Sequence, residues 1–368
     1  MTRPLAEVRR LVVKVGSSSL VDDAGVASRP RLAKVVRDVA GVLERRSCVL
    51  VSSGAIASGL ESLGLSRRPR DMPSLQAAAA VGQGRLMAEY ARLFARRGVV
   101  AAQVLLTQDD FVRRRHYVNA RNTLERLLRA GAVPVVNEND TVATAEITFG
   151  DNDRLAALVA AMIGADLLIL LSDVDGIYTS DPRRGRARLL AEVTDPLAVR
   201  ATGPGTGAAK GGMASKLEAA GVATAAGVGV VVAGASRRDV VARILTGDPV
   251  GTWLPPRGSR RGARKTWLAF ATGVRGRILV DAGAERALRE HGRSLLAAGV
   301  TAVEGEFAAG DPVEIAGPSG AAFARGIANY SSDHLPALAG RSSGDLASAP
   351  GGPYDGEVVH RDELVVIG

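Results

Sequence analysis

The strongest constraint on the fold of this 368-residue chain is a regular alternation of short apolar runs with longer stretches of helical periodicity. The apolar runs predict strands buried on both faces at 11–15, 48–52, 99–106, 133–136, 167–172 and 228–233. The stretches between them predict helices at 30–46, 74–96, 116–130, 151–163 and 213–226. This pattern indicates an α/β fold with a mainly parallel sheet sandwiched between helices. Ligands of such sheets bind beyond the carboxyl ends of the strands.

The pattern changes near residue 252, and we expect two domains. An α/β domain is predicted over 1–252 and a small, mostly-β domain over 266–368, with short β-like pieces at 277–281, 311–317, 323–331 and 357–367. A linker is predicted over 253–265, because LPPRGSRRGARK combines two prolines, two glycines and five basic residues. The same basic residues could instead contact phosphate.

Composition excludes several classes of protein. Only five of the 47 basic residues are lysines, so the net charge of +9 reflects arginine usage and is weak evidence for a nucleic-acid partner. There is no run of 18 apolar residues and no signal-like N-terminus, which predicts a cytoplasmic protein with no membrane segment. The single cysteine, Cys48, cannot form an internal disulfide and is interpreted as a buried strand residue rather than a catalytic thiol.

Three glycine-rich loops suggest phosphate binding, although no Walker A or G-x-G-x-x-G motif is present. KVGSSS, which contains Lys14, Gly16 and Ser17, and VSSGAIASG (51–59) each follow a predicted strand. GPGTGAAKGGMASK (203–216) opens a predicted helix and carries Lys216. Backbone N–H groups in such turns, with a helix behind them, favour anions.

Acidic and amide side chains gather after two further strands. NENDTVA (137–143) follows one strand, and Asp151, Asn152 and Asp153 open a helix. One of these three is expected to cap the helix, but three exceed that need and could hold Mg²⁺, orient the lysines or bind an amino group. Ser172-Asp173 ends a very apolar strand, which suits an adenine-ribose site.

The chain resembles the amino acid kinase family, in its glutamate-phosphorylating branch. The resemblance is carried, in order, by KVGSSS, VSSGAIASG, QAAAAVGQGRLM, NARNTLERLL, VPVVNENDTVATAEITFGDNDRLAALVA, LLSDVDGIYTSDPR and GGMASKLEAA. The C-terminal part is similar to a PUA domain through VDAGAERAL, GRSLLAAGV, VEGEFAAGDPVEI and ARGIANYSSDHL. Together these motifs span essentially the whole chain.

The resemblance implies ATP-dependent phosphorylation of the γ-carboxylate of L-glutamate to L-glutamyl 5-phosphate, the first step of proline biosynthesis. It implies that Lys14 and Lys216 neutralise the transferring phosphoryl group and that Asp153 positions both lysines. The implied glutamate-binding residues are Ser53, Gly54, Asp140, Asp151 and Asn152. The implied ATP-binding residues are Lys14, Gly16, Ser17, Ser172, Asp173, Lys210, Gly211, Gly212, Met213, Ala214, Ser215 and Lys216.

Further expectations follow from the same resemblance. ATP and Mg²⁺ are the implied cofactors, with the metal held mostly by phosphate oxygens and water and no protein ligand assigned. Proline is the implied feedback inhibitor, the chain is expected to form a homo-oligomer (dimer or tetramer), and a glutamyl phosphate reductase is a plausible partner. The glycine loop departs from the family pattern, because Ala208-Ala209-Lys210 lengthens it. Lys210 is either a second phosphate contact or part of a solvated insertion.

Two alternatives stay open. The chain could be a sister amino acid kinase acting on aspartate, acetylglutamate or a nucleotide, although the block 133–160 argues against this. It could instead bind RNA through the PUA-like domain, although few aromatic residues in 266–368 are available to stack on bases.

Overall fold

The computed structural model describes residues 5, 7–22, 27–65, 67–107, 109–142, 152–180, 187–196, 199, 212–257, 274–341 and 356–367. The chain divides into two compact units, one formed by 1–110 with 118–263 and the other by 111–117 with 264–368. The domain limits and the linker expected from the sequence stay predictions, since 258–273 lie outside the described residues. In the described part of the chain, no helix has the length and apolar character needed to cross a bilayer.

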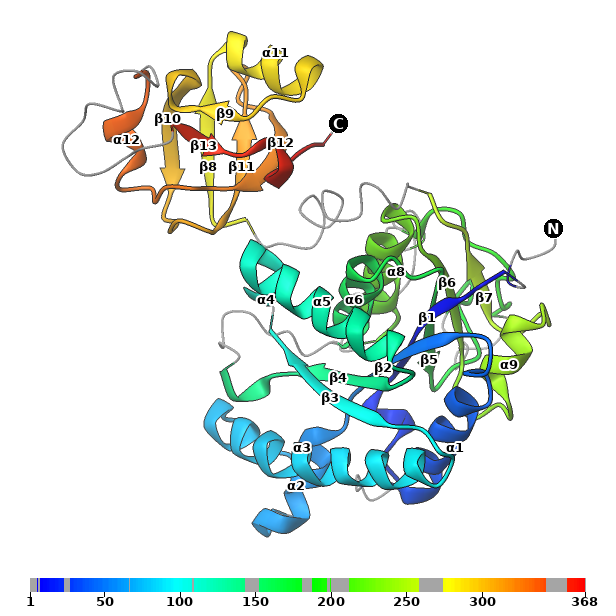
Figure 1. Cartoon of the computed structure of the whole chain (residues 1–368). Helices are drawn as coiled ribbons and strands as arrows, with labels where there is room; N and C mark the ends of the chain where they lie inside the picture. The colour runs from blue at the N-terminus through cyan, green and yellow to red at the C-terminus, as the bar shows by residue number, and fades with distance from the viewer. Residues whose placement is uncertain are drawn as a thin grey trace. The chain divides into compact units, whose positions relative to one another are not determined.

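The first unit is built on one seven-stranded sheet with the order β3-β4-β2-β1-β5-β6-β7 (Figure 1). Its strands are β1 Arg10–Val15, β2 Ser47–Ser52, β3 Ala101–Leu106, β4 Val133–Glu138, β5 Leu167–Ser172, β6 Gly229–Gly234 and β7 Thr252–Leu254. All neighbours pair in parallel except β6 and β7, which are antiparallel. The predicted parallel sheet is confirmed, while the antiparallel edge strand β7 was not predicted.

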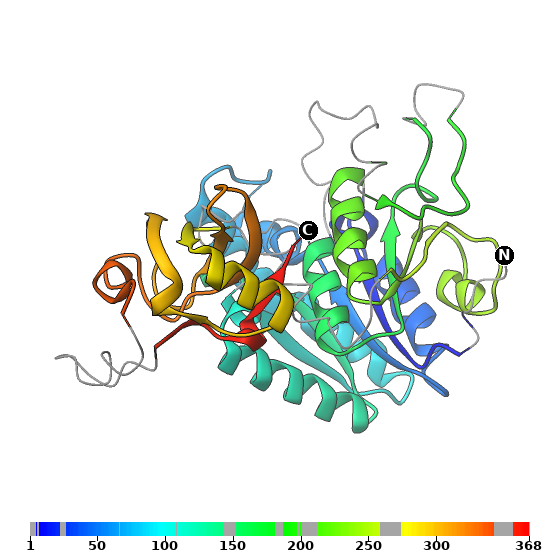
Figure 2. The same cartoon turned by 90° about the horizontal axis from the view of Figure 1, so that it is seen from above.

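Helices cover both faces of this sheet. The described helices are α1 Arg29–Ala40, α2 Ala55–Leu60, α3 Met72–Ala95, α4 Asp109–Val112, α5 Arg114–Arg129, α6 Asn152–Met162, α8 Met213–Ala225 and α9 Val240–Leu245. Figure 1 shows α1 and α3 on one face and α5, α6 and α8 on the other, and Figure 2 shows α6 beside α8. The helix predicted over 30–46 ends at Ala40, because the chain turns at Gly41.

The alternation of side chains along β1 decides where its lysine lies. Leu11, Val13 and Val15 belong to the core cluster that also contains α1 and α3 residues. Successive strand residues point to opposite faces, so Val12 and Lys14 face the layer of α6 and α8. A lysine in a strand with five buried residues therefore points at the N-terminal turns of two helices.

Helices α2 and α3 pack with their backbones in direct contact. A Cβ atom built on Gly82 of α3 would overlap the carbonyl oxygen of Ala55, and one on Gly59 of α2 would overlap that of Ala78. Only glycine permits such an approach. The contact fixes α3 against the segment that follows β2.

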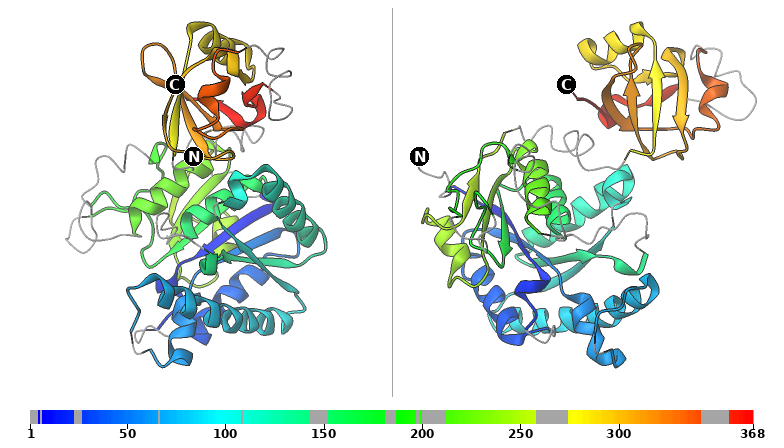
Figure 3. Two further views of the ribbon diagram at one scale, coloured as in Figure 1. Left: turned by 90° about the vertical axis from the view of Figure 1, so that its left-hand side faces the viewer. Right: turned by 180° about the vertical axis from the view of Figure 1, so that it is seen from behind.

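The second unit holds a five-stranded sheet, β10-β8-β11-β12-β14, and a two-stranded sheet, β13-β9 (Figure 3). Its described elements are β8 Gly276–Val280, α11 Ala282–His291, β9 Leu295–Leu296, β10 Val300–Gly305, β11 Pro312–Ala316, β12 Ala322–Ile327, α12 Leu335–Leu338, β13 Glu357–Val359 and β14 Leu364–Val366. This confirms a small, mostly-β domain. The piece predicted over 357–367 is two strands, because a 3-10 turn over Arg361–Glu363 divides it. Helix α11 was missed, although Asp281 caps it and Gly292 ends it.

The contact between α2 and α3 makes a testable pair of substitutions. Gly82→Ala should destabilise the protein by about 1–3 kcal/mol, because its methyl group meets backbone atoms that cannot move independently. Gly84→Ala, two residues further along α3, enters open space and should stabilise the protein by roughly 0.5–1 kcal/mol through helix propensity. Urea denaturation followed by circular dichroism measures both. Equal effects from the two substitutions would contradict the assigned contact.

Candidate active site

An ion triad lies where the first turns of α6 and α8 meet β1. The Nζ of Lys14 is 2.6 Å from Oδ1 of Asp153, and the Nζ of Lys216 donates to Oδ2 of the same carboxylate at 2.8 Å. The three side chains belong to β1, to the start of α6 and to the start of α8. The structure therefore brings together the three residues that the sequence predicted as catalytic.

The triad is buried and carries a net positive charge. Lys14, Asp153 and Lys216 are 4%, 0% and 8% exposed. Burial alone would raise the pKa of Asp153, but the two ammonium groups outweigh it and hold that pKa below its ordinary value. One carboxylate balances only one of two ammoniums, and the N-terminal ends of α6 and α8 add partial positive charge. This end of the site can therefore bind an anion.

A chain of amide hydrogen bonds lies beside the triad. The Nδ2 of Asn152 shares its two hydrogens among three acceptors, the Oγ of Ser53 at 2.8 Å, the carbonyl oxygen of Ser52 at 3.0 Å and Oδ1 of Asn137 at 2.9 Å. The Nδ2 of Asn137 in turn donates to Oε1 of Gln83 at 2.8 Å. We call Gln83, Asn137, Asn152 and Ser53 the amide relay. It joins α3, β4, α6 and the end of β2.

Two half-buried carboxyl groups follow Asn137 in the chain, Glu138 at the end of β4 and Asp140 two residues further on. Burial, together with the nearby Asp140, raises the pKa of Glu138 to about 8. Burial also raises the pKa of Asp140, and the positive charge of Arg68 only partly opposes this. Carboxyl groups whose pKa is raised in this way gain most from a cation arriving beside them. The site thus has a basic end at the triad and an acidic end at Glu138 and Asp140.

Residues predicted to bind ATP line the ends of β1 and β5 and the start of α8. Gly16 and Ser17 follow β1 directly, and Gly16 lies beside Lys14. Ser172 is buried at the end of β5, and its hydroxyl donates to the exposed carboxylate of Asp173 at 3.0 Å. Gly212 precedes α8, whose first turn contains Met213, Ala214, Ser215 and Lys216.

Some predicted residues cannot be placed. Asp151, Lys210 and Gly211 lie outside the described residues, so the question of the longer glycine loop stays open. Gly54, predicted to contact substrate, stands at the start of α2 with φ of 103°, a backbone conformation that glycine adopts without strain. The sharp turn at Gly54 is what carries the chain from Ser53 into α2.

Comparison with known proteins identifies the first unit. The model of the amino acid kinase family matches residues 9–234, more than half of the chain. The chain belongs to the amino acid kinase family. A PUA domain model matches residues 276–348. Among solved structures, a carbamate kinase from Giardia lamblia bound to AMP-PNP is similar with a TM-score of 0.51 and 16% identity, covering 68% of this chain and 100% of that one. That likeness shows the fold alone.

Curated members of the amino acid kinase family match this chain along nearly its whole length. The glutamate 5-kinase of Frankia casuarinae is 51% identical over 99% of this chain and 98% of its own length. The glutamate 5-kinase of Streptomyces coelicolor is 51% identical over 99% of this chain and 98% of its own length. The glutamate 5-kinase of Myxococcus xanthus is 47% identical over 99% of this chain and 97% of its own length.

Sequence reasoning missed three residues of this candidate site. Gln83 and Asn137 stand in stretches that carried the resemblance, but neither was assigned a role. Glu138 was overlooked because nothing in NENDTVA distinguishes a carboxyl that burial keeps protonated from one exposed to water. A glutamine set among alanines and glycines in a packed helix was the one available signal for Gln83.

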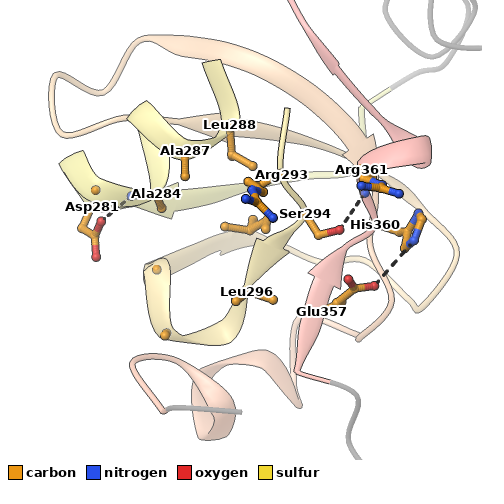
Figure 4. Close-up of a pocket in the computed structure, with 14 residues that line it drawn as sticks. Asp281, Ala284, Ala287, Leu288, Arg293, Ser294, Leu296, Glu357, His360 and Arg361 are labelled. Carbon is orange, nitrogen blue, oxygen red and sulfur yellow. Dashed lines mark hydrogen bonds and ion pairs between the residues drawn. The ribbon is translucent and has the colours of Figure 1, made fainter. Parts of the chain in front are cut away.

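A hollow lies in the other unit, against α11, β9 and β13 (Figure 4). Its volume is about 670 Å³, and Arg293 and Arg361 border it near Ser294, whose Oγ accepts from the backbone N–H of Arg361 at 3.0 Å. At the same hollow, Nε2 of His360 lies 3.9 Å from Oε2 of Glu357. No lysine lines this hollow, and it contains none of the residues predicted for phosphoryl transfer. The triad, rather than this hollow, is the candidate kinase site.

The raised pKa of Glu138 predicts a pH-dependent stability. A carboxyl whose pKa rises from an ordinary 4.5 to about 8 on folding binds its proton more tightly in the folded state, so its contribution falls as pH rises between those values. Glu138→Gln removes this dependence, because glutamine stays neutral. We expect the melting temperature of the variant, relative to the parent, to increase from pH 5 to about pH 8 and to level off above that.

The matched control is Glu61→Gln, whose side chain is 70% exposed. Its melting temperature should differ from that of the parent by the same small amount at every pH. A Glu138→Gln difference that is equally flat would show that Glu138 ionises normally in the folded protein.

Proposed function

We propose that this chain transfers the γ-phosphoryl group of ATP to the γ-carboxylate of L-glutamate, giving L-glutamyl 5-phosphate and ADP. The observation that carries the proposal is the buried Lys14–Asp153–Lys216 triad at the carboxyl end of the sheet. The curated relatives named glutamate 5-kinase support the choice of substrate, because their likeness extends over the whole chain rather than the kinase fold alone.

The reaction requires positioning and charge neutralisation rather than proton transfer. The γ-carboxylate of glutamate is already ionised at neutral pH, with an ordinary pKa near 4.3, so it attacks without a general base. A bond forms between a carboxylate oxygen and the γ-phosphorus, and the bond from that phosphorus to the leaving oxygen of ADP breaks. Negative charge spreads over the transferring group, and the ammoniums of Lys14 and Lys216 face it. Asp153 holds both ammoniums in place.

The polarity of the site suits an amino acid lying between its two ends. The α-ammonium of glutamate would lie at the acidic end, near Asp140, where it favours the ionised carboxylate. Ser53 and Asn152 would hold the body of the substrate, and its γ-carboxylate would face the lysines. ATP would lie over Gly16, Ser17, Ser172 and Asp173 and at the start of α8.

Mg²⁺ would arrive with ATP. Among the described residues, no group of three or more His, Cys, Asp or Glu side chains could hold a metal ion. Both oxygens of Asp153 are engaged by ammonium groups, which leaves it poorly suited as a ligand. Phosphate oxygens and water would therefore be the main ligands of Mg²⁺. We assign no step to a protein-bound metal.

Four finer features remain part of the proposal. The product is a labile acyl phosphate, so a reductase that consumes it is the expected functional partner. Proline would inhibit by competing near the glutamate site. We further propose a homo-oligomer and a cytoplasmic enzyme, the setting in which ATP and glutamate are both available.

Lysine substitutions test the proposed chemistry. Lys14→Gln and Lys216→Gln should each lower kcat about 10²-fold or more, because each removes a preorganised positive charge from the transition state. The KM values should change less. The assay traps the acyl phosphate with hydroxylamine in the presence of Mg-ATP and L-glutamate, L-aspartate or N-acetyl-L-glutamate.

Lys34→Gln is the matched control, since Lys34 pairs with Asp38 on α1 and keeps a hydrogen-bond donor in the variant. It should retain parental activity. Hydroxamate formed from aspartate or N-acetylglutamate, and not from glutamate, would favour a sister kinase. Parental kcat in both triad variants would contradict the assigned role of the triad.

A further inference from the structure

The amide relay has a fixed direction. The carbonyl oxygen of Ser52 can only accept a hydrogen bond, so the group of Asn152 that faces it at 3.0 Å must be the nitrogen. The reversed amide would place two oxygens against each other. Nδ2 of Asn152 is therefore the end that faces Ser53 and Asn137, while its Oδ1 is buried and meets no donor among the described residues.

The orientation of Asn152 also fixes which groups donate and accept in the rest of the relay, as far as Gln83 on α3. Because Asn152 donates, Asn137 must present its oxygen to it, which turns the Nδ2 of Asn137 towards Gln83. Asn137 is 2% exposed, so water cannot easily replace a lost partner. The Oε1 of Gln83 satisfies this donor at 2.8 Å. Gln83 is thus the acceptor that ends the relay and holds Asn137 in the orientation that Asn152 requires.

The other branch of the relay ends at the substrate side. The Oγ of Ser53 lies 2.8 Å from Nδ2 of Asn152, an amide nitrogen that donates and does not accept, so Ser53 can only accept at this contact. The hydrogen of the Ser53 hydroxyl is then left to donate elsewhere, and it finds no acceptor among the described residues. Ser53 is half-buried beside the turn at Gly54. A hydroxyl committed to donating is suited to a carboxylate, which can only accept.

We propose that Gln83 is a positioning residue that holds Asn137, and through it Asn152, in the orientation of the amide relay in which the hydroxyl of Ser53 is left to donate to a carboxylate of the substrate. The proposal rests on the proposed function and adds to it a residue on a different element from those that meet the substrate. Gln83 acts through Asn137 and Asn152 and need not touch the substrate itself.

The packing of α3 suits this role. Gly82, the neighbour of Gln83, lies against the backbone of α2, which follows Ser53 and Gly54 in the chain. One face of α3 also carries Tyr90, seven residues on, whose hydroxyl lies 2.8 Å from the Oγ of Ser52. The helix thus contacts the relay at Gln83 and the end of β2 at Tyr90. The same helix therefore contacts one end of the relay through Gln83 and the residue before Ser53 through Tyr90.

The test compares Gln83→Met, which keeps the length of the side chain but lacks an acceptor, with Gln83→Glu, which keeps an acceptor oxygen whether or not it is protonated. Each is made in the parent and in a Ser53→Ala background. The measurements are kcat and KM for L-glutamate and for ATP in the hydroxamate assay, with melting temperatures as a check on folding.

We expect Gln83→Met to raise the KM for glutamate about tenfold, the scale of one lost hydrogen bond to a charged group, with little change in the KM for ATP. Gln83→Glu should stay within about threefold of the parent, because its acceptor is retained. Gln83→Met should have little further effect in the Ser53→Ala background, since the two residues act through one chain of hydrogen bonds. Such non-additivity would not arise from a purely structural loss.

Three results would overturn the proposal. They are an unchanged KM for glutamate in Gln83→Met, an equal change in Gln83→Glu, or full additivity with Ser53→Ala. A parent protein that forms no hydroxamate from glutamate would contradict the proposed function itself and this inference with it. A parent that is active, with variants that behave additively, would contradict the inference alone.

Discussion

The site depends on one buried carboxylate held between two lysines. Without Asp153, Lys14 would be an ammonium inside a strand of otherwise apolar residues, next to a second ammonium from α8. Burying such charges unpaired costs several kcal/mol, whereas a pair with good geometry recovers most of that cost. The remaining uncompensated charge is what makes this site suitable for phosphate. The same interaction thus permits the lysine in the strand and leaves the triad with a positive charge that can attract an anion.

The amide relay and the acidic end extend this arrangement away from the triad. Asn152 and Asp153 are adjacent, so the first turn of α6 serves both the charged and the neutral part of the site. Strand β4 contributes Asn137 to the relay and Glu138 to the acidic end. The site therefore offers positive charge, neutral amides and carboxyl groups. This arrangement follows from the strand order β4-β2-β1-β5, which sets the carboxyl ends of those strands side by side.

Much of the sheet and of the candidate site could be predicted from the sequence, because buried parallel strands consist of continuous apolar runs. The polar residues that follow these strands meet at one edge of the sheet. Ser172 and the VSSGAIASG turn that contains Ser53 were found in this way, and Lys14 was found as a charge inside an apolar run. Helices α2 and α9 were missed because six residues are too few to show a helical period. The relay was missed because the pairing of Gln83 with Asn137 spans 54 residues and depends on how closely α3 approaches the sheet. No local sequence pattern predicts how closely α3 approaches the sheet.

The strand order also bears on how the protein acquires its shape. Strand β1 lies at the centre of the sheet and pairs with β2, which follows soon after it, and with β5, which begins at Leu167. Its lysine is balanced only when Asp153 is in place, and Lys216 joins later still, 63 residues beyond Asp153. During synthesis, which begins at the N-terminus, β1 therefore lacks its partner β5 and the charge of Lys14 lacks its partner Asp153 until most of the first unit has been made. Such non-local closure slows folding and leaves one edge of β1 exposed until β5 has been made and can pair with it.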